Sequence, residues 1–295
     1  MRKAALMFAL LCVVATAALA QELSPFKPPK TDKVPPSDIY AADALKNSPR
    51  HGEMIDIKLP DGQMIKSWIV YPQASGKVGV VIVIHEIFGL TDWVRGVADQ
   101  VAKDGFIAIA PDLISGFGPG GGGTAEVIAA GGQPTTVINQ VKPSIQVDRL
   151  NAVMAYGKSL PSSNGKTGTV GFCWGGSASF NYATAQPALA AAVVFYGTAP
   201  TKLVDGKQAP DPDLLGKINA PVIGFYPSLD NRTASSVEPT AAAMKAAGKS
   251  YESHILDGAS HGFMREQGKT EALADYKAAE QAWPAVIKFF QARLK

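Results

Sequence analysis

The stretch GTVGFCWGGSAS, residues 168–179, ends a short apolar run with a cysteine set among glycines. A structural cysteine is usually a small buried hydrophobe, and glycines weaken a strand interior. The spacing of Gly171, Cys173 and Gly175 matches the G-x-S-x-G pattern of a nucleophile on a sharp strand-to-helix turn, with cysteine in the place of serine. The glycines are needed because neighbouring backbone lies too close for side chains. The alternative interpretation is ordinary strand-to-helix packing.

Apolar runs and helical patterns alternate on both sides of this stretch. Six runs are typical of buried parallel strands: 78–85, 106–112, 166–173, 189–197, 220–227 and 250–257. Helical patterns fall at about 92–104, 146–159, 176–186, 237–248 and 271–293, the last with a kink expected at Pro284. Residues 53–59 and 64–72 alternate around Asp61-Gly62 and predict a hairpin. The alternation predicts one three-layer α/β domain with a mostly parallel central sheet.

The N-terminal residues have a different character from the rest of the chain. Residues 1–20 carry two cations, an apolar run and small residues before Gln21, which predicts a signal peptide cleaved after Ala20 and an exported protein. Cleavage removes Cys12 and leaves Cys173 without a partner in its own chain. We expect no stable membrane insertion of the mature chain. Residues 21–50 are rich in Pro and Lys and predict an extended arm with one helical turn near residues 43–47, ahead of a domain at 51–295.

The overall charge limits the kinds of partner. The 295 residues hold 28 basic and 25 acidic side chains, and loss of Arg2 and Lys3 with the leader brings the two nearly into balance. Without a basic stripe, the sequence argues against a nucleic-acid partner. A glycine-rich insertion at residues 115–143 is either a tolerated surface loop or a flap over the site.

A nucleophile on such a turn is followed along the chain by an acid and then a base. Asp230 and His261 each come after a predicted strand, so we expect them at the sheet edge that also holds Cys173. His261 would accept the proton from sulfur while Asp230 fixes its tautomer. The other candidates are Asp257, close to His261, Asp205, Asp211 and Asp213 in loops, and His51, His85 and His254 in the arm's end, at a strand end and within a strand.

The run VIVIHEIFGL, residues 81–90, leads to Glu86. In this kind of site, the loop after the third strand and the residue after the nucleophile supply the oxyanion-hole amides. This nominates the backbone amides of Ile87 and Trp174. A carboxylate is costly at the end of a buried strand unless something pairs with it. Glu86 therefore either serves the site or pairs with a nearby backbone or basic group.

Four segments in this order and spacing resemble the dienelactone hydrolase family of α/β-hydrolases, also called carboxymethylenebutenolidases: HEIFG (85–89), GFCWGG (171–176), SLD (228–230) and SHGFMR (260–265). The resemblance covers roughly residues 51–295. It implies an α/β-hydrolase fold and a Cys173, Asp230 and His261 triad that opens the lactone ring of dienelactones. It also implies that Glu86 holds the resting thiol by a hydrogen bond and is displaced when substrate binds. Together with the signal-peptide pattern, it indicates a bacterial periplasm, and secretion beyond the periplasm stays an open alternative.

The family's best-known members bind the substrate carboxylate with two arginines. One matches Arg265, whose guanidinium offers a bidentate fork. The other belongs in the region after Asp112, where this chain reads LISGFGPGGGG without an arginine, and Gly262 replaces a family serine. Tyr196 matches a tyrosine near the family's active site, although packing is an equal alternative. The missing arginine puts a dienelactone in question as the substrate.

The sequence therefore predicts a carboxylic-ester hydrolase that acts on a small ester or lactone and needs no metal or organic cofactor. Two alternatives stay open. The same triad could serve another acyl substrate, such as a thioester, a peptide or an aromatic ester. A catalytically idle scaffold could instead bind a small carboxylate or a partner protein, since fold alone does not establish function. The sequence leaves the oligomeric state and the physiological substrate open.

Overall fold

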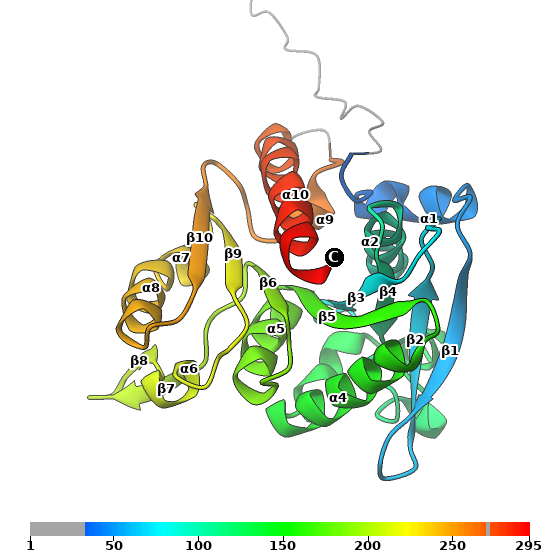
Figure 1. Cartoon of the computed structure of the whole chain (residues 1–295), viewed down its shortest axis with the longest axis horizontal. Helices are drawn as coiled ribbons and strands as arrows, with labels where there is room; N and C mark the ends of the chain where they lie inside the picture. The colour runs from blue at the N-terminus through cyan, green and yellow to red at the C-terminus, as the bar shows by residue number, and fades with distance from the viewer. Residues whose placement is uncertain (1–32, 270–271) are drawn as a thin grey trace, which may run out of the picture.

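The computed structural model describes residues 33–269 and 272–295, so the predicted leader and most of the predicted arm lie outside the described residues. An eight-stranded sheet crosses the fold in the order β1-β2-β4-β3-β5-β6-β9-β10 (Figure 1). Its strands are β1 (Gly52–Lys58), β2 (Met64–Val70), β3 (Val78–Ile84), β4 (Ile107–Pro111), β5 (Ser163–Phe172), β6 (Ala191–Phe195), β9 (Val222–Pro227) and β10 (Tyr251–Leu256). Only β2 runs against its neighbours. The predicted mostly parallel sheet is confirmed.

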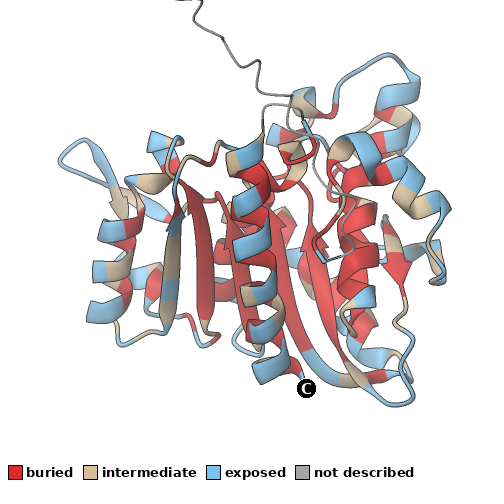
Figure 2. Cartoon of the chain, turned by 90° about the horizontal axis from the view of Figure 1, so that it is seen from above, coloured by how far each residue is buried: buried red, intermediate tan, exposed pale blue. Residues whose placement is uncertain are grey.

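Helices cover both faces of this sheet. The first face carries α1 (Asp38–Lys46), α2 (Asp92–Lys103), α9 (Phe263–Glu266) and α10 (Leu273–Leu294). The second carries α4 (Pro143–Ser159), α5 (Trp174–Ala185), α6 (Pro212–Leu215) and α8 (Val237–Ala246). In β3, Val81 and Val83 join the first core while Ile82 and Ile84 join the second, because successive strand residues point to opposite faces. Figure 2 shows the buried strands between helices whose outer sides are exposed.

The turn from β5 into α5 depends on unusually close backbone packing. A Cβ on Gly175 would lie 2.4 Å from the carbonyl oxygens of both Ile84 and His85, at the end of β3. A Cβ on Gly176 would lie 2.4 Å from the Phe195 carbonyl oxygen, at the end of β6. These distances are shorter than any side chain tolerates. The glycines that the sequence places around Cys173 therefore let the start of α5 rest directly on two strands.

The part of the predicted arm that the structure describes is more ordered than the sequence indicated. In place of an extended segment with one turn, α1 forms a full helix beside α2 (Figure 1). Ala41 is completely buried, and a Cβ on Gly96 of α2 would lie 2.8 Å from Pro36. Arg50 donates to Asp99 through both Nε and Nη2, which ties the end of the arm to α2. Packing against α2 stabilises a helix whose own apolar periodicity is weak.

Two further segments differ from the sequence-based expectation. The insertion contains α3 (Thr124–Ala129) and three short 3₁₀ turns, η1 (Pro119–Gly121), η2 (Pro134–Thr136) and η3 (Ile138–Gln140). Asp112 anchors α3 by accepting hydrogen bonds from the Thr124 amide, at 2.6 Å, and hydroxyl, at 2.8 Å. A small hairpin of β7 (Thr201–Val204) and β8 (Lys207–Pro210), absent from the prediction, follows β6 and precedes β9 along the chain. It forms a separate two-stranded sheet.

The ends of several helices also shift. Helix α4 begins at Pro143, three residues before the predicted start, because proline suits the first helical turn. Helix α10 continues through Pro284 to Leu294. A short helix, α7 (Asn231–Ala234), follows β9. Across residues 33–269 and 272–295, none of the helices has both the length and the apolar character of a membrane span.

We predict that Gly175→Ala destabilises the fold by about 3 kcal/mol or more, because the new methyl group meets two main-chain oxygens that cannot rotate away. Urea unfolding followed by circular dichroism measures the change. Gly76→Ala is the matched control, since a Cβ there meets nothing within 4 Å, and should shift stability by less than about 1 kcal/mol. Equal midpoints for the two variants would contradict the close packing of the turn.

Candidate active site

The predicted site residues follow strands whose carboxyl ends meet at one edge of the sheet. Glu86 follows β3, Cys173 follows β5, Asp230 follows β9 and His261 follows β10. These four strands are parallel within the sheet. The carboxyl edge of such a sheet is where open α/β folds bind their ligands.

Cys173 has a backbone conformation that side chains rarely adopt. Its φ is 54° and its ψ is −115°, and its amide donates to the Phe195 carbonyl oxygen at 3.0 Å. Strain of this kind persists only where the surroundings impose it, here through the close packing at Gly175. Burial raises the pKa of the half-buried thiol and the charge of Glu86 raises it further, while the amide of Trp174 acts in the opposite direction. The resting thiol is therefore protonated at neutral pH.

His261 and Asp230 are brought together as the sequence predicted. The distance between His261 Nδ1 and Asp230 Oδ2 is 2.6 Å. The Thr233 hydroxyl donates to the same carboxylate oxygen at 2.7 Å. Burial acts to raise the pKa of Asp230, but the hydrogen bonds from Thr233 and His261 outweigh it and hold that pKa below its usual range. Asp230 is therefore ionised at neutral pH and accepts a proton-bearing Nδ1, which leaves Nε2 of His261 as the basic nitrogen.

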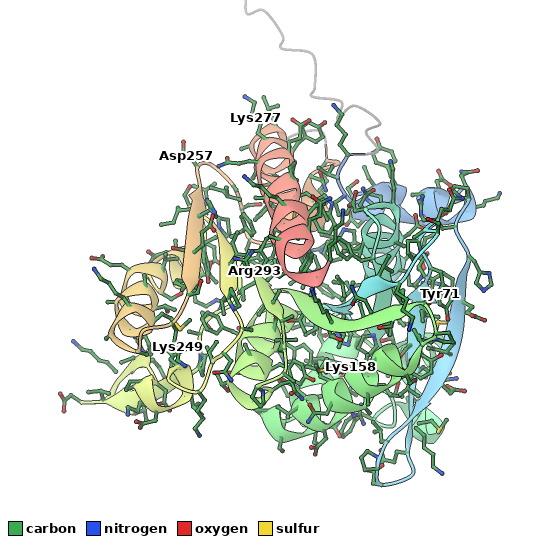
Figure 3. The ribbon with its side chains drawn as sticks, viewed as in Figure 1. Tyr71, Lys158, Lys249, Asp257, Lys277 and Arg293 are labelled. Atoms are coloured by element: carbon green, nitrogen blue, oxygen red, sulfur yellow. The ribbon has the colours of Figure 1, made fainter. Side chains whose placement is uncertain are left out.

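The rival acids lie elsewhere. Asp257 directly follows the carboxyl end of β10, where its side chain is exposed (Figure 3). Asp205 occupies the β7–β8 turn with a φ of 51°. Asp211 accepts from the amide of Asp213 at the start of α6, and both pair with Lys202. Among these acids, only Asp230 has a hydrogen bond to His261 within the described residues.

Cys173 and Tyr196 are not joined to this pair by hydrogen bonds. Within the described part of the chain, no hydrogen bond connects the Cys173 thiol with His261. Tyr196 is completely buried, with a φ of 39°, and its ring packs edge-on against the His261 ring at a centroid distance of 5.0 Å. Its hydroxyl has no partner among the described residues. In this structure Tyr196 thus supports the histidine ring, and its contact with substrate stays a prediction.

Glu86 pairs with Arg265 rather than with the thiol. Arg265 Nε donates to Glu86 Oε2 at 2.9 Å, and the Glu86 side chain is only 4% exposed. Burial raises the pKa of Glu86 to about 7, although the Arg265 charge and hydrogen bond lower it and the charge of Asp38 raises it. A guanidinium is a charged donor and forms a stronger hydrogen bond to a carboxylate than a thiol does. The role of Arg265 in binding a substrate carboxylate stays a prediction.

His85 is a site residue that the sequence analysis considered only as an alternative base. It lies just beyond β3 and is completely buried. Its Nδ1 is 2.6 Å from the Glu86 carbonyl oxygen, and its Nε2 accepts from the Leu113 amide at 3.0 Å. Its ring stacks on Trp174 at 5.5 Å between centroids. His85 therefore connects the loop of Ile87 with Trp174, the two residues nominated for the oxyanion hole.

The loop that carries His261 is also fixed, just before the histidine, by a residue that the sequence did not single out. Asp275 in α10 accepts from the Ser260 amide at 2.7 Å and from the Ser260 hydroxyl at 2.8 Å. The sequence position of Asp275 gave no sign of this role, because an acidic residue in the first turn of a helix is already explained by the helix dipole. For His85, the neighbouring Glu86 was the available clue. Within the described residues, no cluster of three or more His, Cys, Asp or Glu side chains is arranged to hold a metal ion.

Comparison with known proteins gives a consistent likeness. The model of the Dienelactone hydrolase family matches residues 65–294. A curated relative from Synechocystis sp., named "Putative carboxymethylenebutenolidase", is 32% identical over 237 residues that cover 78% of this chain and 93% of the relative. A crystal structure from Klebsiella pneumoniae, named "Putative Dienelactone Hydrolase", superposes with a TM-score of 0.65 at 25% identity and covers 82% of this chain and 98% of its own. A dienelactone hydrolase-like promiscuous phosphotriesterase from metagenomic libraries shares the fold, with a TM-score of 0.67 at 21% identity over 83% of this chain and 99% of its own.

We predict that Glu86→Gln lowers the pKa of the Cys173 thiol, because the substitution removes a negative charge that disfavours the thiolate. The rate of iodoacetamide alkylation as a function of pH, with the Cys173 peptide followed by mass spectrometry, gives this pKa. Glu238→Gln, an exposed change on α8, is the control and should leave it unaltered. An unchanged thiol pKa in Glu86→Gln would mean that burial alone sets it.

Proposed function

Because this chain belongs to the dienelactone hydrolase family, we propose that it hydrolyses a small carboxylic ester or lactone through a triad of Cys173, His261 and Asp230. The observation that carries the proposal is the 2.6 Å contact between His261 and Asp230 at the sheet edge where a strained turn presents Cys173. A histidine oriented by a shielded carboxylate, beside a nucleophile on such a turn, is an arrangement suited to acyl transfer.

In the proposed first step, the Nε2 of His261 takes the proton of the Cys173 thiol as the sulfur attacks the substrate carbonyl. The negative charge of Asp230 stabilises the imidazolium that forms. The developing oxyanion accepts hydrogen bonds from the amides of Ile87 and Trp174. The stacking of His85 on Trp174 and its hydrogen bond to the Glu86 carbonyl support this role by fixing both loops.

The tetrahedral adduct then expels the alcohol, which receives its proton from His261, and leaves a thioester on Cys173. Water attacks this thioester with His261 as the base, the carbon–sulfur bond breaks, and the acid product and the free thiol are released. In a lactone the alcohol remains attached to the acyl group, so the ring-opened product is a single hydroxy acid. A thioester substrate would follow the same steps with a thiol as leaving group.

Glu86 is proposed to keep the resting thiol protonated. Its negative charge beside Cys173 opposes thiolate formation, and a protonated thiol is less readily oxidised. This protection matters for the proposed setting, the bacterial periplasm, which rests on the signal-peptide pattern of residues 1–20. The thiolate then forms only when a bound substrate brings the carbonyl, the sulfur and His261 together.

We predict that Cys173→Ala abolishes turnover of p-nitrophenyl acetate and of cis- and trans-dienelactone, because it removes the nucleophile. We also predict that Asp230→Asn lowers kcat by about 10² to 10⁴, because the amide permits the wrong tautomer of His261. Initial rates of ester and lactone hydrolysis measure both effects. Asp257→Asn is the matched control for the acid and should retain full activity, since Asp257 is exposed and points away from the body of the domain. Undiminished ester turnover in Cys173→Ala would refute the nucleophile.

A further inference from the structure

The guanidinium of Arg265 is occupied by three carboxylates from three parts of the chain. Nε donates to Glu86 at 2.9 Å, and Nη1 donates to Asp38 at 3.3 Å. Nη1 also pairs with Glu266 on the same short helix, and one face of the guanidinium covers the ring of Phe88 at 5.0 Å. Nε, Nη1 and one face of the Arg265 guanidinium are therefore occupied.

This arrangement leaves no intact fork for a substrate carboxylate. A guanidinium grips a carboxylate with two nitrogens at once, either Nε with one Nη or the two Nη atoms together. Glu86 has taken Nε, and Asp38 and Glu266 have taken Nη1. Only Nη2 remains without a hydrogen-bond partner in the described part of the chain, and one nitrogen cannot make a bidentate contact.

Asp38 is held in place by the docking of the arm. It is the first residue of α1, and the Ile39 amide donates to its second carboxylate oxygen at 2.8 Å. The buried side chain of Gln267, two residues after Arg265, donates to the Pro35 carbonyl oxygen at 3.1 Å. The arm therefore contacts the segment of Arg265 at two points, and Asp38 is part of a fixed surface.

The charges in this cluster sum to a negative value. Arg265 and Lys269, which pairs with Glu266, supply two positive charges. Glu86, Asp38 and Glu266 supply three negative ones when ionised. The cluster also influences the reactive thiol. The charge of Asp38 raises the pKa of Glu86, and the charge of Glu86 raises the pKa of the Cys173 thiol. A further carboxylate, brought by the substrate, would meet electrostatic repulsion here.

Three exposed apolar side chains contact or adjoin in sequence a residue of the cluster or of the candidate triad. Phe88, Leu229 and Ile39 are 38%, 70% and 54% exposed. Phe88 covers Arg265, Leu229 precedes Asp230 in the chain, and Ile39 follows Asp38. Of the three, Phe88 contacts the cluster directly, and its partly exposed ring offers apolar surface beside Arg265.

Resting on the proposed ester hydrolysis, we propose that Asp38 is a specificity-determining residue that occupies Arg265 and commits the site to esters or lactones with an uncharged acyl group. In the wild-type protein, a carboxylate on the acyl group is disfavoured. Loss of the Asp38 charge frees one N–H of Arg265 Nη1, the other still pairing with Glu266, and increases the preference for anionic substrates.

Two p-nitrophenyl esters with acyl chains of equal length test the proposal. The valerate is neutral, and the mono-glutarate ends in a carboxylate. We expect wild-type kcat/KM to favour the valerate by about tenfold or more, and Asp38→Asn to raise the glutarate-to-valerate ratio by about tenfold. Asparagine keeps the size of the side chain and the acceptor for the Ile39 amide. Asp43→Asn, an exposed change on the same helix, should leave the ratio at the wild-type value, and adding Arg265→Gln to Asp38→Asn should remove the gain.

Alkylation of Cys173 gives a second reading that needs no turnover. Iodoacetamide and iodoacetate differ by one negative charge, so the ratio of their rates reports the charge selection at the thiol. We expect this ratio to exceed that of a small neutral thiol in the wild-type protein and to fall several-fold in Asp38→Asn, with Asp43→Asn unchanged. Thermal unfolding of each variant verifies that the fold is intact.

The two readings separate failure of this proposal from failure of the proposed function. A wild-type protein that hydrolyses the glutarate as well as the valerate overturns the role of Asp38, and so does an unaltered ratio in Asp38→Asn. A gain that survives Arg265→Gln overturns it as well. If neither ester is turned over, ester hydrolysis fails, and the alkylation ratio alone then supports or refutes charge selection by Asp38.

Discussion

The strained backbone at Cys173 is the constraint on which the site depends. A φ of 54° at a non-glycine residue is maintained because α5 starts in contact with the ends of β3 and β6, with Gly175 and Gly176 lying against main-chain oxygens. This contact places the sulfur at the carboxyl edge of the sheet. The loops after β9 and β10 then carry Asp230 and His261 to the same edge. The geometry of the candidate triad thus follows from backbone packing in the centre of the sheet rather than from the loops alone.

Several polar groups of the site are held by neighbours whose ionisation they also influence. Thr233 and His261 stabilise the Asp230 carboxylate, and Asp275 holds the loop before His261. Glu86 is buried with a pKa near 7 and changes its charge in the physiological range. The Cys173 thiol, the Glu86 carboxylate and the Arg265 guanidinium are therefore electrostatically coupled, so that a change in the charge of one alters the ionisation of the others.

The sequence predicts the elements that repeat a local pattern and misses those that depend on distant contacts. Apolar runs and glycine spacing located the parallel strands and the turn at Cys173, and the order of residues along the chain located Asp230 and His261. The helix α1 was missed because its stability comes from packing on α2. The positioning role of His85 was missed because it lies in two hydrogen bonds and a stacked ring. The occupation of Arg265 by Asp38 spans 227 residues, which no local pattern encodes.

The large sequence separation between Asp38 and Arg265 affects the order in which the protein assembles. The contact between Asp38 and Arg265 closes almost the whole chain into a loop, and the entropy cost of closing a loop rises with its length. The arm is the first described segment in the chain, whereas its partners Arg265 and Gln267 belong to one of the last. A chain delivered from its N-terminus can pack the arm on α2 early, but it forms the contacts of Asp38 with Arg265 and of Pro35 with Gln267 only when synthesis is nearly complete. The charge environment of the sulfur is consequently among the last features to mature, after the central strands have already joined.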